Sequence, residues 1–221
     1  MSRHPAGRGS FGARLDAATG ASWGLDRGTL ERLDALDQFV ERFDRNVNLT
    51  GFRSSEVRLC RYFGEALAVL HALLPLPTGA AVDVGSGGGT PALPLAIARP
   101  ELSWTLVEPR RKRAMFLEQA SHELGILNVK VYHGRLEAYA EAGAPASSCI
   151  TVRGLGLDVA RRDALMRLVA TEGRILLLSG ERRLRDEALA WSEVGARVDG
   201  PWPLLPRAVV ASGWMLQVET S

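Results

Sequence analysis

One stretch, residues 80–98, limits the fold of this chain more than any other part of its sequence. It begins with apolar residues that suit a buried strand, continues into a cluster of glycines and ends in an apolar segment that suits a helix. Glycines allow a sharp turn at which a ligand can approach the main chain, and the N–H groups at the start of the helix point toward that ligand. The sequence AAVDVGSGGGTPALPLAIA therefore predicts a nucleotide-type binding site.

The composition excludes several other classes of protein. The chain has 221 residues, of which 46% are hydrophobic and 24% charged, as is ordinary for one soluble domain. No apolar run is long enough to span a bilayer, and the N-terminus lacks the apolar core of a secretory leader, so we expect a cytoplasmic protein with no membrane partner. The two cysteines and four histidines follow no metal-ligand spacing, and we expect no metal site.

Patterns along the chain divide it into three parts. The first residues are rich in Gly, Ser, Ala and Arg, a composition that is typical of a flexible segment. Apolar residues at helical spacing predict one helix over 29–46 and a second helix that begins at Ser54 or Ser55 and ends at Leu74. The predicted parts are a flexible tail over 1–26, a helical cap over 27–77 and a ligand-binding domain over 78–221.

Strand and helix patterns alternate after residue 79. Short apolar segments predict strands, and the longer segments between them predict helices. Repeated units of this kind build an α/β fold, a mostly parallel sheet with helices on both faces that binds ligands beyond the carboxyl ends of its strands. The predicted strands cover 81–84, 103–108, 129–133, 149–152, 173–178 and 214–218, and the later helices cover 110–124, 158–170 and 181–194.

The glycine loop helps to choose between two nucleoside cofactors. The dinucleotide fingerprint G-x-G-x-x-G would require a glycine at position 90, where the chain has Thr90. The segment DVGSGGG (83–89) is closer to the D-x-G-x-G-x-G loop of methyltransferases that use S-adenosylmethionine (SAM). SAM carries an amino group and a carboxylate where a dinucleotide carries a pyrophosphate. We expect Asp83 to bind that amino group, directly or through water, and glycine N–H groups to bind the carboxylate.

A second acidic residue supports a nucleoside ligand. Glu108 ends the second predicted strand, about twenty residues after the loop, where a carboxylate accepts hydrogen bonds from ribose hydroxyls. NAD and SAM both contain such a ribose, so Glu108 does not choose between them. An NAD oxidoreductase is nevertheless the least favoured function, because Thr90 interrupts the fingerprint and the chain shows no catalytic dyad.

Five blocks of the sequence occur in a characteristic order. They are Asn48-Leu49-Thr50, DVGSGGGTPALPLAIARPEL (83–102), RRKRAMFLEQASHELGILNV (110–129), HGRLEAYA (133–140) and Val152-Arg153-Gly154-Leu155. Together they resemble the bacterial glucose-inhibited division protein B family, SAM-dependent methyltransferases that act on a guanine N7 of small-subunit (16S) ribosomal RNA. The resemblance runs from about residue 30 to residue 180. It implies a Rossmann-like class I SAM-dependent methyltransferase fold with SAM as the cofactor.

The resemblance also implies roles for individual residues. Leu136 and Glu137 would flank the adenine, with a backbone N–H contact, and Glu108 would bind the ribose. Arg153, at the end of the fourth predicted strand, would face the reaction centre as the catalytic residue. The expected cofactor-binding residues are Asp83, Gly85, Gly87, Gly89, Thr90, Glu108, Leu136, Glu137 and Arg153.

Two further groups of residues are candidates for RNA binding. Four basic residues open the helix after Glu108, and because cations oppose the dipole at a helix N-terminus, RNA phosphate would compensate them; a solvated charge run is an equally weighted alternative. Asn48 and Thr50 either turn the chain between two helices or face the cleft. The expected partner is ribosomal RNA or the small ribosomal subunit, bound by a monomer. The basic residues are Arg110, Arg111, Lys112 and Arg113.

The implied reaction is a direct in-line methyl transfer. Guanine N7 carries an exposed lone pair, so positioning and charge control supply most of the catalysis, and no general base is needed. Two positions differ from the family pattern, since Tyr62 replaces a histidine and Ser179 replaces a lysine. They leave two alternatives open: a relative that methylates a different substrate, and a SAM-binding protein that has lost catalysis.

Overall fold

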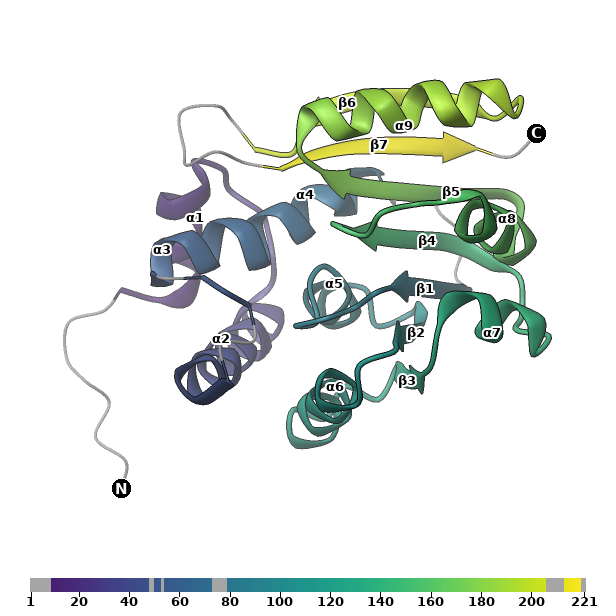
Figure 1. Ribbon diagram of the computed structural model, residues 1–221. Coiled ribbons are helices and arrows are strands. Elements are labelled where there is room, and N and C mark those ends of the chain that lie inside the picture. The colour runs from purple at the N-terminus through teal and green to yellow at the C-terminus, as the bar shows by residue number, and fades with distance from the viewer. Residues whose placement is uncertain (1–8, 48–49, 53, 73–78, 206–212, 220–221) are drawn as a thin grey trace.

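The computed structural model describes residues 9–47, 50–52, 54–72, 79–205 and 213–219. Its centre is a seven-stranded sheet with the strand order β3-β2-β1-β4-β5-β7-β6 (Figure 1). Strands β1 to β5 are parallel, and β7 runs antiparallel to both of its neighbours, so the mostly parallel sheet is confirmed. The strands are β1 (Ala80–Val84), β2 (Ser103–Glu108), β3 (Val129–His133), β4 (Ser147–Arg153), β5 (Val169–Ser179), β6 (Arg197–Pro203) and β7 (Trp214–Glu219).

Helices cover both faces of the sheet, as predicted. Successive side chains of a strand point to opposite faces, and in β5 Leu176 and Leu178 join one buried cluster while Ile175 and Leu177 join the other. The first cluster contains the N-terminal helices, and the second contains the helices that follow β3, β4 and β5. The first face carries α5 (Ala92–Ala98) and α6 (Arg111–Glu123), and the second carries α7 (Leu136–Glu141), α8 (Val159–Leu168) and α9 (Glu181–Glu193).

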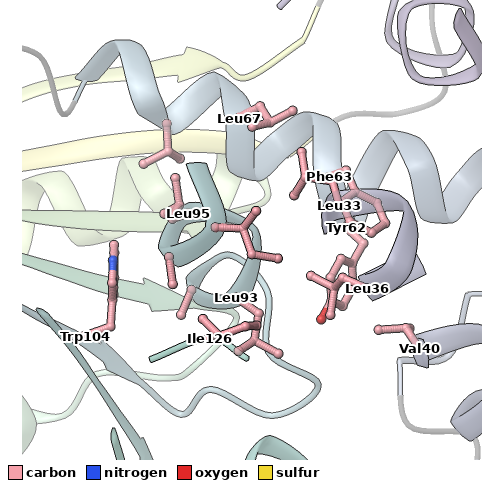
Figure 2. Close-up of a cluster of buried hydrophobic side chains, with 14 of the residues drawn as sticks. Leu33, Leu36, Val40, Tyr62, Phe63, Leu67, Leu93, Leu95, Trp104 and Ile126 are labelled. Carbon is pink, nitrogen blue, oxygen red and sulfur yellow. The ribbon is translucent and has the colours of Figure 1, made fainter. Parts of the chain in front are cut away.

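The helical cap packs on the first face. Helix α2 (Arg27–Val47) packs against a helical ribbon that is continuous in Figure 1. The ribbon comprises α3 (Ser55–Arg58), the π-helical turn η1 (Leu59–Gly64) and α4 (Glu65–Ala72). In Figure 2, Leu36 of α2, Tyr62 of η1 and Leu93 of α5 lie in one buried cluster. The sequence predicts a single helix to Leu74; the structure has a π turn within it, and residues 73–78 lie outside the described residues. The boundaries at 27–77 and 78–221 stay predictions.

The tail predicted over residues 1–26 is wrong for the part that the structure describes. Residues Phe11–Thr19 form helix α1, which begins at Ser10, whose side chain accepts a hydrogen bond from the Ala13 N–H. Phe11 and Leu15 are buried, and the Phe11 ring meets the Phe63 ring edge-on at 5.2 Å. Glycines and arginines around this short helix obscure its apolar spacing in the sequence. The helix is too short to be stable alone, and burial of its apolar residues against η1 stabilises it.

Two elements of the sheet domain were missed in the sequence. Helix α7 has only six residues and continues into a loop rich in Ala and Gly, which conceals its periodicity. Strand β6 contains Gly200-Pro201, and its register with β7 shifts between Asp199 and Trp202. Proline has no backbone N–H to donate, so within sheets it occurs at edge strands and bulges. Strand β6 is an edge strand.

Candidate functional site

A cavity of about 520 Å³ opens at the carboxyl ends of β1, β2 and β4. This is the edge at which parallel α/β sheets bind their ligands. Five of the nine residues expected to bind the cofactor line this cavity, although their contacts with a cofactor stay a prediction. The cavity is lined by Val84, Gly85, Val107, Glu108, Pro109, Arg110, Arg113, Arg135, Leu136, Glu137, Arg153, Gly154, Leu155 and Arg161.

Glu108 joins the glycine loop to the start of α6. Its Oε2 accepts a hydrogen bond from the Gly87 N–H at 2.7 Å, and its Oε1 accepts one from the Arg110 N–H at 2.9 Å. The residue is only 2% exposed, yet it lines the cavity. Because each carboxylate oxygen has two lone-pair sites, Glu108 can still accept bonds from a ligand. Backbone donors therefore hold in place the acceptor that was predicted to bind the ribose.

Asp83 is buried and is not one of the residues that line the cavity. Its Oδ1 accepts a hydrogen bond from the Thr151 hydroxyl at 2.6 Å, whereas its buried Oδ2 has no hydrogen-bond partner among the described residues. Burial raises the pKa of the Asp83 carboxyl to about 6, against the lowering effect of the hydrogen bond from Thr151. The unpartnered oxygen could accept a hydrogen bond from a positively charged group.

Asp83 should make stability depend on pH. A pKa of about 6, compared with an ordinary value of 3.8, means that the folded state binds more protons than the unfolded state between these pH values. Stability should therefore fall as pH rises from 4 to 6.5, by about 2 kcal/mol from this group. Urea unfolding over that range should show an Asp83→Asn variant losing less stability than the parent chain. Parallel pH curves for the two proteins would contradict this effect of burial.

Tyr62 of η1 forms hydrogen bonds with the rest of the glycine loop. The Tyr62 hydroxyl donates to the Gly88 carbonyl at 2.7 Å, and the Thr90 hydroxyl donates to the Tyr62 carbonyl at 2.9 Å. Burial raises the pKa of Tyr62 well above its ordinary value, so this donor keeps its proton. Gly87, Gly89 and Thr90 do not line the cavity, and their predicted contacts with a cofactor stay predictions. Their observed role is to shape the loop.

Arg153 occupies the end of β4 and lines the cavity, as expected for a residue at the reaction centre. It also has a carboxylate partner, since its Nη2 lies 2.7 Å from Oε2 of the buried Glu65. No pattern in the sequence singled out Glu65, because the two residues are 88 positions apart. The family difference at Tyr62 was the one sequence signal that pointed to this helix.

The four basic residues at the start of α6 separate into two pairs. Arg110 and Arg113 line the cavity. Arg113 also lies next to the glycine loop, since a Cβ at position 87 would be 3.3 Å from its Nη1. Arg111 and Lys112 are exposed and lie outside the cavity lining. None of the four forms an ion pair with a described residue, and the first turn of α6 contains no acidic residue.

Other arginines join this cavity from different elements. Arg135 directly precedes α7 and has no ion-pair partner among the described residues, while Arg161 of α8 pairs with Asp158 at 3.0 Å and lies 3.6 Å from Glu137. Arg135 was missed in the sequence, although it stands next to Leu136. The cavity mouth is consequently rich in guanidinium groups.

The candidate residues between the cap helices lack a described link to this cavity. Asn48 lies outside the described residues. The Thr50 N–H donates to Asp44 Oδ1 at 2.7 Å, and the Thr50 hydroxyl donates to the same carboxylate. This pattern is the turn that the sequence offered as one of two interpretations, and the RNA contact of Thr50 stays a prediction.

Two kinds of site were also sought in the part of the chain that the structure describes. No group of three or more His, Cys, Asp or Glu side chains there is arranged to hold a metal ion. No helix within the described ranges has the length and apolar character needed to cross a membrane.

Comparison with known proteins relates this site to a methyltransferase family. The profile of the GidB family, rRNA small subunit methyltransferase G, matches residues 29–194. The ribosomal RNA small subunit methyltransferase G of Halorhodospira halophila is 35% identical over 158 residues, which cover 72% of this chain and 73% of that protein. The protein of the same name from Neisseria meningitidis serogroup C is 36% identical over 126 residues, or 56% of this chain and 60% of the relative.

The solved structures agree on the fold. Precorrin-6Y C5,15-methyltransferase from Geobacter metallireducens superimposes with a TM-score of 0.57 at 15% identity, over 71% of this chain and 87% of the other. The predicted class I SAM-dependent methyltransferase fold is therefore confirmed. Since the family match spans most of the sequence, the chain belongs to the GidB family of rRNA small subunit methyltransferases G.

Proposed function

We propose that this chain transfers a methyl group from SAM to N7 of a guanine in small-subunit ribosomal RNA. The observation that carries the proposal is the meeting of Gly85, Glu108 and Arg153 around one cavity at the carboxyl ends of three strands. Both relatives described above are named ribosomal RNA small subunit methyltransferase G. The expected monomeric state and cytoplasmic location stay predictions.

The residues present fit SAM. Glu108 offers carboxylate oxygens to the ribose hydroxyls, and the unpartnered Oδ2 of Asp83 suits the amino group, directly or through water. Leu136 and Glu137 line the cavity beyond β3, where the adenine would lie. Thr90 and Gly89 hold the loop in shape, through the Thr90 bond to Tyr62 and the close packing around Gly89, and their contacts with the cofactor stay predictions.

Methyl transfer to guanine N7 requires few catalytic groups from the protein. When bound, SAM supplies an electrophilic methyl group on a positively charged sulfur. Guanine N7 is already a nucleophile, so this chain needs to bind and orient the base and to exclude competing water. Arg153 is the residue we assign to the acceptor, because guanidinium N–H groups suit the carbonyl oxygen and phosphates of a guanine nucleotide. No residue is required to remove a proton.

RNA binding should depend on the exposed pair of α6. An Arg111→Glu, Lys112→Glu variant should bind ribosomal RNA more weakly and reduce the slope of log affinity against log salt concentration, by about one for each lost phosphate contact. Its affinity for SAM should stay unchanged, because neither residue lines the cavity. Filter binding of RNA at several salt concentrations and calorimetry with SAM would measure the two effects.

A matched variant sharpens this test. Arg182→Glu, Arg185→Glu changes the charge by the same amount on α9, and neither residue lines the cavity. Equal losses of RNA affinity in the two variants would show that total charge, and not the face of α6, determines binding.

The activity itself is testable with labelled SAM. We expect tritium to pass from the methyl group of SAM to 16S ribosomal RNA, or to small subunits, taken from a strain that lacks the corresponding methyltransferase gene. The labelled nucleoside should be 7-methylguanosine. Transfer only to another cell fraction would favour a different substrate, and SAM binding without any transfer would indicate a protein that has lost catalysis.

A further inference from the structure

The Glu65 carboxylate is a buried junction between three distant segments. Its side chain is 2% exposed, and its Oε2 accepts a hydrogen bond from Arg153 Nη2 at 2.7 Å. Its Oε1 accepts bonds from the Gly213 N–H at 2.6 Å and from Arg61 Nε at 3.4 Å. A buried carboxylate is costly unless it is paired and hydrogen-bonded, and Glu65 meets both conditions through residues of the site.

Arg153 stands where two cavities meet. It lines the 520 Å³ cavity and also a neighbouring cavity of about 160 Å³, which is bounded in addition by Arg61, Glu65, Ser179 and Gly213. Both of its hydrogen bonds, to Glu65 and to the Arg61 carbonyl at 3.3 Å, use the same nitrogen, Nη2. Its Nε and Nη1 have no acceptor among the described residues. The guanidinium is therefore anchored on one side and keeps donors for a ligand on the other.

The charge of Glu65 also matters at this position. The methyl donor and Arg153 are both cations, and like charges repel more strongly where water is excluded. A carboxylate bonded to the guanidinium offsets that repulsion without occupying its remaining donors. A neutral residue at position 65 would keep part of the hydrogen bonding but not this compensation.

The π turn is the part of this helix that bonds to both Arg153 and the glycine loop. The Arg61 carbonyl accepts from Arg153, and one residue later Tyr62 bonds to both Gly88 and Thr90 of the glycine loop. π turns are rare and occur often at functional sites. Within this turn, the Arg61 carbonyl bonds to Arg153 and the next residue, Tyr62, bonds to the glycine loop.

We propose that Glu65 is a positioning residue, which holds the Arg153 guanidinium at the junction of the two cavities so that its other N–H groups meet the methyl acceptor. This inference rests on the proposed function, in which Arg153 contacts the acceptor. The carboxylate itself touches neither SAM nor RNA. Its effect on methyl transfer passes through Arg153.

The test replaces Glu65 in the full-length chain. A Glu65→Gln variant should lose about 100-fold in the single-turnover rate of methyl transfer to unmethylated 16S ribosomal RNA, because misplacement of a positioned group by about 1 Å can cost this much. Its SAM dissociation constant by calorimetry should rise by less than about tenfold, from the lost charge compensation, because Glu65 does not line the larger cavity. Glu65→Asp keeps the charge and should recover part of the lost rate.

A second buried ion pair serves as the matched control. Asp37 of α2 is 4% exposed in its side chain and pairs with Arg58 Nε at 2.5 Å, away from both cavities. Asp37→Asn should reduce stability to a similar degree, yet transfer the methyl group at the parent rate at temperatures where both variants are folded. Equal rates for Glu65→Gln and Asp37→Asn under those conditions would overturn the positioning role.

The control also separates this inference from the function on which it rests. A parent chain that transfers no methyl group to ribosomal RNA would overturn the proposed function and the role of Glu65 together. An active parent chain with a fully active Glu65→Gln variant would overturn only the role of Glu65.

Discussion

Replacing Gly89 by alanine should lower the free energy of unfolding by about 2–6 kcal/mol, the sum of a backbone and a packing cost. Gly89 has a φ of 91°, which side chains rarely adopt. A Cβ at this position would lie 2.4 Å from Leu93 Cδ1 and 3.0 Å from the Tyr62 hydroxyl oxygen. Both neighbours are buried and have little room to move, so the loop must shift, and SAM affinity should fall with it.

The control isolates the packing cost. Gly143 also has a positive φ, 75°, but a Cβ there would meet nothing within 4 Å. Gly143→Ala should therefore cost only the backbone strain, about 1 kcal/mol, and leave SAM binding intact. Urea unfolding and SAM calorimetry on both variants give the comparison. Similar losses in the two would mean that the Leu93 and Tyr62 side chains relax without cost.

The second large effect concerns the cofactor. Glu108→Ala should weaken SAM binding about 100-fold, equivalent to about 3 kcal/mol. The substitution removes the proposed ribose acceptor and also leaves the Gly87 and Arg110 N–H groups without their charged partner. Hydrogen bonds to charged groups contribute about 1.5–3 kcal/mol, so the loss of even one such bond has a measurable effect. Calorimetry at fixed pH and salt concentration would measure it.

Another acidic residue of the same cavity provides the comparison. Glu137 lines the cavity, but its side chain is 30% exposed and lies 3.6 Å from Arg161. Partly exposed ion pairs contribute about 0–1 kcal/mol, so Glu137→Ala should change SAM affinity by less than about fivefold. If both variants lost the same affinity, the negative charge of the cavity, and not the bonds made by Glu108, would control binding.

The sheet domain was largely predictable because its signals are local. Strand β5 contains the continuous apolar run 175–178, and β3 has apolar residues at 129, 131 and 132. A parallel sheet follows once such segments alternate with helices. The position of the cavity followed in turn, since Glu108 and Arg153 end strands that must meet at the same edge. For these residues, spacing in the sequence was enough to bring them together.

Other features depend on contacts that spacing does not encode. Glu65 meets Gly213 across 148 positions, and nothing in the local pattern distinguishes it from a solvated acidic residue. Helix α1 is too short to be stable alone and exists because Phe11 and Leu15 are buried against the cap. Strand β6 forms at the sheet edge in spite of Gly200-Pro201, because pairing with β7 outweighs its low strand propensity.

The π turn Leu59–Gly64 sets the rotational phase of the cap helix. Each hydrogen-bonded loop of a π turn encloses one residue more than that of an α-helix, so the residues after the turn are rotated about the axis relative to those before it. Arg58, before the turn, faces Asp37 of α2, and Glu65, after it, faces Arg153. One residue fewer or more in this segment would turn Glu65 by about 100° away from its partner. The length of this short segment is thus as much a determinant of the site as the chemistry of its side chains.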